Sequence, residues 1–240
     1  MRRLEQAQKL MAKWGISYVD AIQDYRYFVS EALRSSSKSF LLDACCGADS
    51  SSIKGLNATG RNVGLDLNPA SLKKNTCISD AVMGNLTALP FKNDSFQAVS
   101  LHWGIEHISR PLSALKEAYR VLNPGGRVVI MTTNIWSPFY FLAKITPHVF
   151  HKFVRKRLLE TGEEGVCRTY YRANTPFKMK KLLRQAGFSK IALRYRGNPA
   201  SFAFLTVTFF IGLLYEKVTD FFIFRYLKMF IVSSGDKPIS

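Results

Sequence analysis

Long apolar runs, cysteines and export signals are scarce in this 240-residue sequence. The one extended apolar run, Phe202 to Tyr215, is shorter than the roughly 20 residues that a membrane-spanning helix needs. The first fifteen residues interleave basic and apolar side chains, so we expect an amphipathic helix there rather than a signal peptide. The four cysteines, including the adjacent Cys45 and Cys46, show neither metal-ligand spacing nor a secreted disulfide pattern. The sequence therefore predicts a cytoplasmic protein with no transmembrane helix and no metal site.

Acidic residues are also few, because 17 Asp and Glu stand against 34 Lys and Arg, for a formal net charge of +17. The excess is concentrated between Lys144 and Arg196, where 14 basic residues accompany three acidic ones. Such a charge attracts phosphate-bearing partners or an anionic membrane surface. The alternative is that these basic residues form a solvent-exposed face that binds no partner.

The hydrophobic residues, 47% of the chain, suffice for one substantial core. Short apolar runs alternate with segments of helical period, which predicts a mostly parallel sheet with helices on both faces. The expected strands are 40–42, 63–67, 98–101, 127–133 and 190–195. The expected helices are 18–33, 50–56, 112–122, 176–184 and, in the apolar C-terminal part, 202–230.

A small-residue turn follows the first strand. This turn, Asp43 to Asp49, contains the single glycine Gly47 and lets backbone amides approach a ligand closely. About twenty residues later the second strand ends at Asp66, where an acid can accept both hydroxyls of a nucleoside ribose. A dinucleotide is an alternative ligand, but its pyrophosphate requires a loop with three glycines. An ordinary strand-turn-helix without a ligand is the other alternative.

The loop and Asp66 are part of a longer stretch of similarity: the chain resembles the class I S-adenosylmethionine-dependent methyltransferases of the ubiquinone and small-molecule type. Four blocks match in order, and Gly187-Phe188 matches the stretch before the sixth strand of such enzymes. The sequence departs from the family where Cys45 and Asp49 replace glycines and Asn85 replaces an aspartate. The four blocks are 41–49, 64–69, 84–96 and 121–131.

The resemblance implies a doubly wound, Rossmann-like sheet with an antiparallel last strand, and S-adenosylmethionine as the cofactor. It implies that the loop after the first strand surrounds the methionine moiety, that Asp66 binds the ribose, and that Asn85 and Leu86 flank the adenine. The implied cofactor-binding residues are Asp43, Ala44, Cys45, Gly47, Asp66, Leu67, Asn85, Leu86 and His102.

Methyl transfer to a hydroxyl needs in-line positioning and a base near the cofactor. His102 and His107 follow the fourth strand and are the candidate catalytic residues, although His107 also suits a packed helix end. Trp136, Tyr170 and Tyr171 lie in an aromatic and basic stretch and are candidates for contact with the acceptor, or else for the core.

We expect a single domain over residues 1–240. Its parts are a helical lead (1–38), a cofactor-binding core (39–133), a cap insertion (134–175) and a C-terminal part (176–240) with an apolar helical insertion (198–230). The apolar insertion either packs on the core or a second subunit, giving a homodimer, or lies in a membrane interface.

The predicted function is S-adenosylmethionine-dependent O-methylation of a small-molecule, glycan or lipid-linked acceptor. The predicted location is the cytoplasm, with the inner membrane face as a peripheral site. Two alternatives remain: an RNA methyltransferase, suggested by the charge, and a catalytically silent binding protein, suggested by Cys45 and Asp49.

Overall fold

A computed structural model describes residues 20–34, 39–56, 60–145, 168–198 and 206–239. The chain forms two compact units, which we call the sheet unit (21–133, 169–194 and 231–240) and the α8 unit (1–20, 134–168 and 195–230). The predicted N-terminal amphipathic helix and most of the cap insertion fall outside the described residues.

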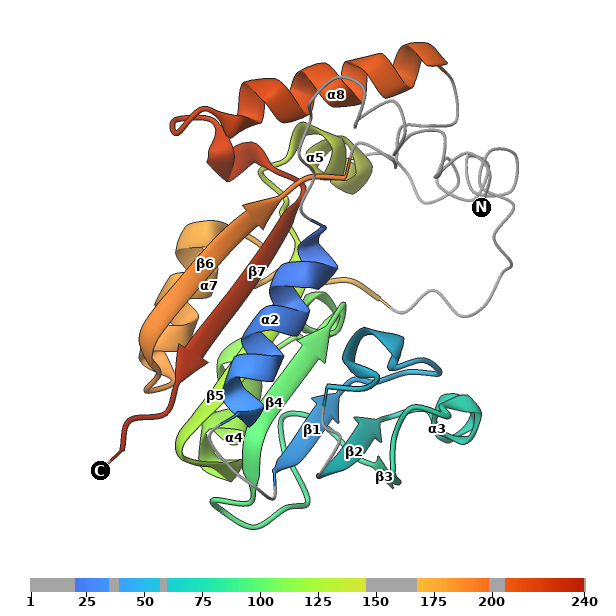
Figure 1. The fold of residues 1–240 in the computed structure, drawn as a ribbon, viewed down its shortest axis with the longest axis vertical. Helices are drawn as coiled ribbons and strands as arrows, with labels where there is room; N and C mark the ends of the chain where they lie inside the picture. The colour runs from blue at the N-terminus through green and yellow to red at the C-terminus, as the bar shows by residue number, and fades with distance from the viewer. Residues whose placement is uncertain (1–19, 35–38, 57–59, 146–167, 199–205, 240) are drawn as a thin grey trace. The chain divides into compact units, whose positions relative to one another are not determined.

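A seven-stranded sheet has the order β3-β2-β1-β4-β5-β7-β6. Strands β1 to β5 run parallel to one another. Strand β7 runs the other way (Figure 1), and its end exchanges backbone hydrogen bonds between Lys237 and the Gly125-Gly126 pair. This arrangement confirms the predicted doubly wound sheet with an antiparallel last strand. The strands are β1 (Phe40–Ala44), β2 (Arg61–Asp66), β3 (Asp80–Met83), β4 (Phe96–His102), β5 (Leu122–Thr133), β6 (Ser189–Arg196) and β7 (Phe230–Asp236).

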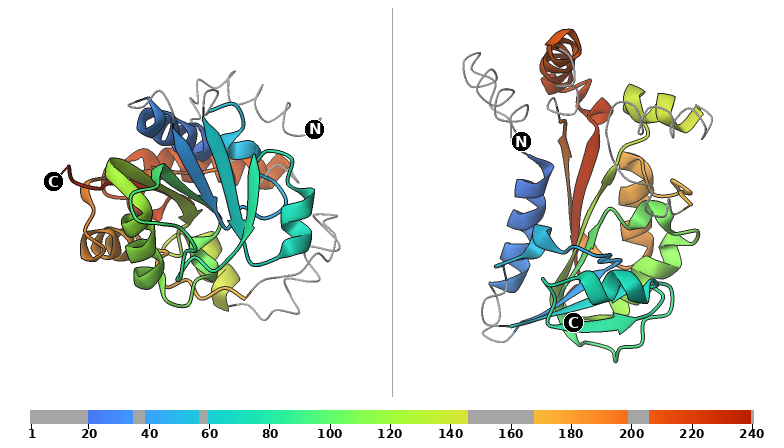
Figure 2. Two further views of the ribbon diagram at one scale, coloured as in Figure 1. Left: turned by 90° about the horizontal axis from the view of Figure 1, so that it is seen from below. Right: turned by 90° about the vertical axis from the view of Figure 1, so that its right-hand side faces the viewer.

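Helices cover both faces of the sheet unit. Helix α2 (Ala21–Leu33) packs on β4 and β5, whereas α4 (Pro111–Val121) packs on β5 and on α7 (Pro176–Gln185). Figure 2 shows α2 on one side of the sheet and α4 with α7 on the other. The predicted start of α7 is confirmed, because the Thr175 side chain accepts a hydrogen bond from the Lys178 N–H and Pro176 occupies the first turn.

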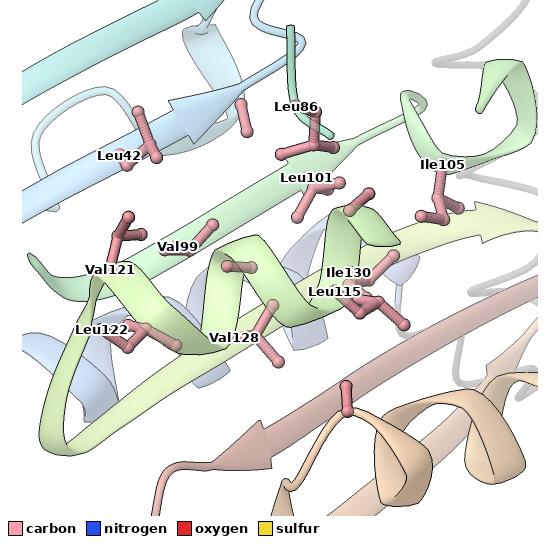
Figure 3. Close-up of a cluster of buried hydrophobic side chains, with 14 of the residues drawn as sticks. Leu42, Leu86, Val99, Leu101, Ile105, Leu115, Val121, Leu122, Val128 and Ile130 are labelled. Carbon is pink, nitrogen blue, oxygen red and sulfur yellow. The ribbon is translucent and has the colours of Figure 1, made fainter. Parts of the chain in front are cut away.

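The main hydrophobic cluster lies between α4 and the strands beneath it. In Figure 3, Leu115 and Val121 from the helix approach Val99 of β4 and Val128 of β5. All four side chains are fully buried. This packing holds β4 and β5 in place, so the carboxyl ends of the strands form a fixed edge.

Three local predictions were wrong or incomplete. Residues 50–56 form only a 3-10 turn, η1 (Ser51–Ile53), because serines favour helix poorly and Gly55 ends the segment at φ 76°. The strand expected over 127–133 begins earlier, at Leu122, which already pairs with Phe96, and the register shifts between Leu122 and Arg127. Helix α3 (Pro69–Lys74) and the edge strand β3 were not predicted, because both are short and largely exposed.

The α8 unit contains α5 (Pro138–Ile145), α8 (Thr206–Asp220) and the 3-10 turn η5 (Arg225–Leu227). Within it, the backbone N–H of Asn134 donates to the Met229 carbonyl. The helix predicted over 202–230 ends at Asp220, because a turn follows and β7 begins at Phe230. Across the residues that the structure describes, no helix combines the length and apolar character needed to cross a membrane.

Candidate functional site

The loop after β1 takes a conformation that side chains seldom adopt. Cys45 has φ 60° and Gly47 has φ 55°, both in the left-handed region that favours glycine. Behind the loop, the buried Asn75 amide donates to the carbonyls of Cys46 and Gly47 and to the Ser50 hydroxyl. The loop is therefore held from one side by Asn75.

Asp66, at the carboxyl end of β2, faces this loop. Its two carboxylate oxygens accept hydrogen bonds from the N–H groups of Gly47 and Asn68, each at 2.9 Å. Each oxygen keeps a further lone pair, and the side chain is partly exposed, so the carboxylate can still accept from ligand hydroxyls. Next to it, the side chain of Leu67 is 67% exposed and offers an apolar surface.

Asp43, at the end of β1, has a different environment. Its buried carboxylate accepts hydrogen bonds from Ser50 Oγ at 2.5 Å and from Ser100 Oγ at 2.9 Å. Burial raises the pKa of this carboxyl to about 6, although the two serine hydrogen bonds oppose the rise. Ala44 beside it is fully buried. In this structure Asp43 thus links the loop to β4.

Cys45 lies against Gly104, which follows β4. A Cβ added at Gly104 would come within 2.6 Å of the Cys45 Cβ, so this contact depends on glycine. Burial raises the pKa of the Cys45 thiol to about 12, and the nearby carboxylates of Asp66 and Asp43 add to the rise. The thiol is therefore protonated at neutral pH and is not a nucleophile.

Asn85 and Leu86, the two residues expected beside the adenine, differ in their exposure to solvent. Asn85 is exposed, and its side-chain oxygen accepts from the N–H and hydroxyl of Thr87, which forms a local turn. Leu86 is 2% exposed, and its side chain belongs to the hydrophobic cluster. Only Asn85 presents a side chain at the surface here.

His102 ends β4 beside aromatic rings. Its ring centroid lies 5.4 Å from those of Tyr25 and Trp103. Burial lowers the pKa of His102 to about 4, so the ring is neutral near pH 7. Its Nε2 atom is buried and has no hydrogen-bond partner among the described residues. Such an atom is the kind that a bound ligand or water satisfies.

A buried polar network follows β4 in the 3-10 turn η2 (Ile105–His107). Glu106 accepts from the Thr132 hydroxyl at 2.9 Å, and the Asn174 amide donates to the same hydroxyl at 2.8 Å. Burial raises the pKa of Glu106. The backbone carbonyl of Glu106 also accepts from the N–H groups of Tyr170 and Tyr171. The half-buried His107 is its neighbour in sequence.

The predicted site residues thus separate into two groups. The sheet unit brings together the loop, Asp66 and His102 at the carboxyl ends of β1, β2 and β4, and holds Tyr170 and Tyr171 beside η2. Trp136 belongs to the α8 unit, where its side chain is 41% exposed, and its contact with an acceptor stays a prediction.

The donor and acceptor set of the sheet unit fits the expected S-adenosylmethionine. A Cβ added at Gly47 would meet nothing within 4 Å, so open space adjoins the loop. Asp66 retains acceptor capacity for a ribose. The residues present are therefore compatible with this cofactor.

Sequence reasoning missed several polar residues that shape this edge. They are Ser50, Asn75, Ser100, Glu106 and Thr132. None of these residues has a local spacing that signals its partner, because the partners come from distant segments.

Comparison with known proteins gives consistent matches. The family described as a methyltransferase domain matches residues 42–130. A demethylmenaquinone methyltransferase of Staphylococcus haemolyticus is 32% identical over 176 residues, covering 67% of this chain and 73% of the relative. One of Staphylococcus saprophyticus is 30% identical over 193 residues, covering 74% and 82%. The fold is also similar to the crystal structure of a putative methyltransferase from Bacillus halodurans, with a TM-score of 0.53 and 18% identity, over 89% of this chain and 98% of that one.

Proposed function

Because the chain belongs to the class I S-adenosylmethionine-dependent methyltransferases, we propose that it methylates a small, hydroxyl-bearing ring compound of the quinol class. The chain is a methyltransferase enzyme, and S-adenosylmethionine is its cofactor. When bound, this cofactor supplies a methyl group already activated on a sulfonium. The protein's own work is binding, alignment and proton removal.

The proposed cofactor site consists of residues at the carboxyl ends of the strands, around the loop after β1. Asp66 accepts the ribose hydroxyls, and its hydrogen bond from the Gly47 N–H keeps the loop beside it. Leu67 covers one side of the nucleoside, and the exposed Asn85 lies near its base. Cys45 and Gly47 adjoin the methionine part, while Asp43 and Ala44 support the loop from beneath.

The acceptor class is carried by one observation, the similarity to relatives named demethylmenaquinone methyltransferases over 73% to 82% of their length. A reduced quinone bears ring hydroxyls. Loss of a hydroxyl proton makes the ring oxygen a nucleophile and also enriches the neighbouring ring carbons in electrons. We propose the hydroxyl oxygen as the methyl-accepting atom, and a ring carbon is the competing atom.

The two histidines receive different roles. A base works best when its pKa is near the operating pH, and burial lowers the pKa of His102 to about 4. We therefore assign His102 to positioning the acceptor through its buried Nε2, in the tautomer that carries its proton on Nδ1. His107, half-buried on η2, is the proposed base. Tyr170, Tyr171 and Trp136 are the proposed acceptor contacts.

The test is a methyl-transfer assay with labelled S-adenosylmethionine and a panel of acceptors: a quinol without its methyl group, a simple phenol, a glycan, a lipid-linked glycan and RNA. We expect transfer to the quinol. His107→Gln should lower kcat by about 10²- to 10⁴-fold. His102→Gln should mainly raise the KM for the quinol, because it removes a positioning contact.

The products distinguish the outcomes. A methyl group on oxygen supports the proposal, whereas one on ring carbon corrects the accepting atom and leaves the quinol class intact. Preferred labelling of RNA or a glycan would contradict the quinol class. Transfer to none of the acceptors by protein that binds the cofactor would also contradict it. The comparisons give no support to an RNA methyltransferase or a silent binding protein.

A further inference from the structure

Helix α8 presents apolar side chains to solvent. Phe210, Ile211, Leu214 and Val218 are 40% to 64% exposed and recur at helical spacing, so they share one side of the helix. The opposite side is buried and includes the polar Glu216 and Thr219 as well as Phe209 and Leu213. Surface helices of soluble proteins usually show the reverse pattern, with polar residues outward.

The turn after α8 continues this surface. Phe221, Phe222 and Ile223 are 70%, 70% and 76% exposed, and Phe224 is 44% exposed. Four consecutive large apolar side chains at a turn are unusual in a protein surrounded by water, and exposed apolar patches mark interaction sites. Together with the outward side of α8 they form what we call the apolar strip, residues 210, 211, 214, 218 and 221–224.

Three basic and two acidic side chains lie beside the apolar strip. The two carboxylates of α8, Glu216 and Asp220, both bind Lys228 Nζ, at 2.8 and 2.9 Å. The guanidinium of Arg225 lies 4.3 Å from the ring centroid of Phe222, and Lys217 is exposed on the helix. In the sequence of the α8 unit, 14 Lys and Arg accompany 7 Asp and Glu.

We propose that the apolar strip docks on an anionic lipid surface. The side chains of residues 221–224 enter the apolar edge of the bilayer, while Lys217 and Arg225 face the lipid headgroups. The whole chain carries a charge of +17, which attracts anionic lipid and opposes the approach of a second identical chain. Charge therefore favours lipid over a homodimer as the occupant of the strip. This docking is independent of which compound accepts the methyl group.

The experiment is co-sedimentation of the full chain with phosphatidylcholine vesicles, prepared with and without phosphatidylglycerol. We expect binding to the anionic vesicles and much weaker binding to the neutral ones. The double variant Phe221→Ser/Phe222→Ser should bind the anionic vesicles at least about tenfold more weakly, because it loses apolar area that lipid would cover. The matched control is Phe177→Ser on α7, a phenylalanine that is 63% exposed outside the strip, and it should bind like wild type.

Three results would overturn the proposal. One is no binding of the wild type to anionic vesicles. Another is equal binding of the wild type and the double variant, which would leave only general charge attraction. The third is a wild-type dimer in sedimentation velocity, without lipid, that the double variant converts to monomer. Circular dichroism of both variants should show the same secondary structure as the wild type. A loss of binding then reflects the changed surface and not unfolding.

Discussion

At the scale of single residues, two aspartates of the same edge differ because their surroundings differ. Asp43 is buried between two serine hydroxyls, whereas Asp66 is partly exposed and accepts two backbone N–H groups. Burial disfavours a charged carboxylate, and hydrogen bonds from N–H groups favour it. We infer that Asp43 organises the loop and that Asp66 meets the ligand.

Replacing Asp43 by Asn should change how the stability of the protein depends on pH. Burial raises the pKa of Asp43 from 3.8 to about 6, so between these values the folded protein holds the proton more tightly than the unfolded chain. The stability that Asp43 contributes is therefore fully present below pH 3.8, the pKa in the unfolded chain, and is lost as the pH rises through about 6, the pKa in the folded protein. The loss is roughly 3 kcal/mol.

Urea unfolding of the wild type and Asp43→Asn across this pH range measures the effect. The unfolding free energy of the wild type, minus that of the variant, should fall as pH rises through about 6. The opposite trend from His102, whose pKa is lowered to about 4, is present in both proteins and cancels in the difference. A difference that stays constant with pH would contradict the burial of a titrating Asp43.

At the scale of elements, the loop after β1 and the segment after β4 touch through Cys45 and Gly104. The two positions restrict each other, because Cys45 occupies the left-handed region and Gly104 has no room for a Cβ. Glycine is usual at position 45 in the family that the sequence resembles, and it takes this conformation without strain. The cysteine therefore both strains the loop and fills the space beside Gly104.

This contact predicts non-additive effects in a double-mutant cycle. Cys45→Gly should raise the unfolding free energy by up to about 1 kcal/mol, because glycine relieves the left-handed strain. Gly104→Ala should lower it by about 1 to 3 kcal/mol through overpacking. The double variant should recover most of that loss, with a coupling energy of at least about 1 kcal/mol in denaturant titrations. Simple addition of the two single effects would show that the residues do not restrict each other.

At the scale of the whole molecule, ligand binding and folding are linked, since a ligand that binds only the folded state stabilises it. The proposed cofactor residues come from β1, β2 and β4, so they meet only when the sheet is formed. Any ligand at this edge should therefore protect the sheet unit against unfolding.

The linkage can be measured with S-adenosylhomocysteine, the demethylated form of the cofactor. At 100 times its Kd, the wild type should gain about 2.7 kcal/mol in unfolding free energy. Asp66→Ala should gain about 1.4 kcal/mol or less at the same concentration, because a lost charged hydrogen bond weakens binding by about tenfold or more. Asp80→Ala, which removes an exposed ion pair with Arg61, is the matched control and should behave like wild type. Equal protection of Asp66→Ala would exclude Asp66 as a ribose ligand.

Much of the sheet was predictable because its signals are local. The strand cores at 40–42 and 98–101 are short apolar runs, and the period of 112–122 and the Thr175-Pro176 start of α7 each lie within a few residues. Elements without such signals were missed. Strand β3 has exposed residues at alternate positions and only four residues, and α3 has six, too few to show a helical period.

The chain's local patterns were enough to predict the sheet class, the loop after β1 and the place of Asp66 at the end of β2, and its resemblance over four blocks predicted the methyltransferase family. They could not establish the polar contacts at the strand ends, because hydrogen-bond partners there are joined only by folding. Ser100 meets Asp43 across 57 residues, and Asn174 meets Thr132 across 42. Nor could they show that apolar residues of α8 face outward, because a helical period indicates that residues share a side but not whether that side is buried. Burial depends on what the rest of the chain places against each side, so it is a property of the folded molecule.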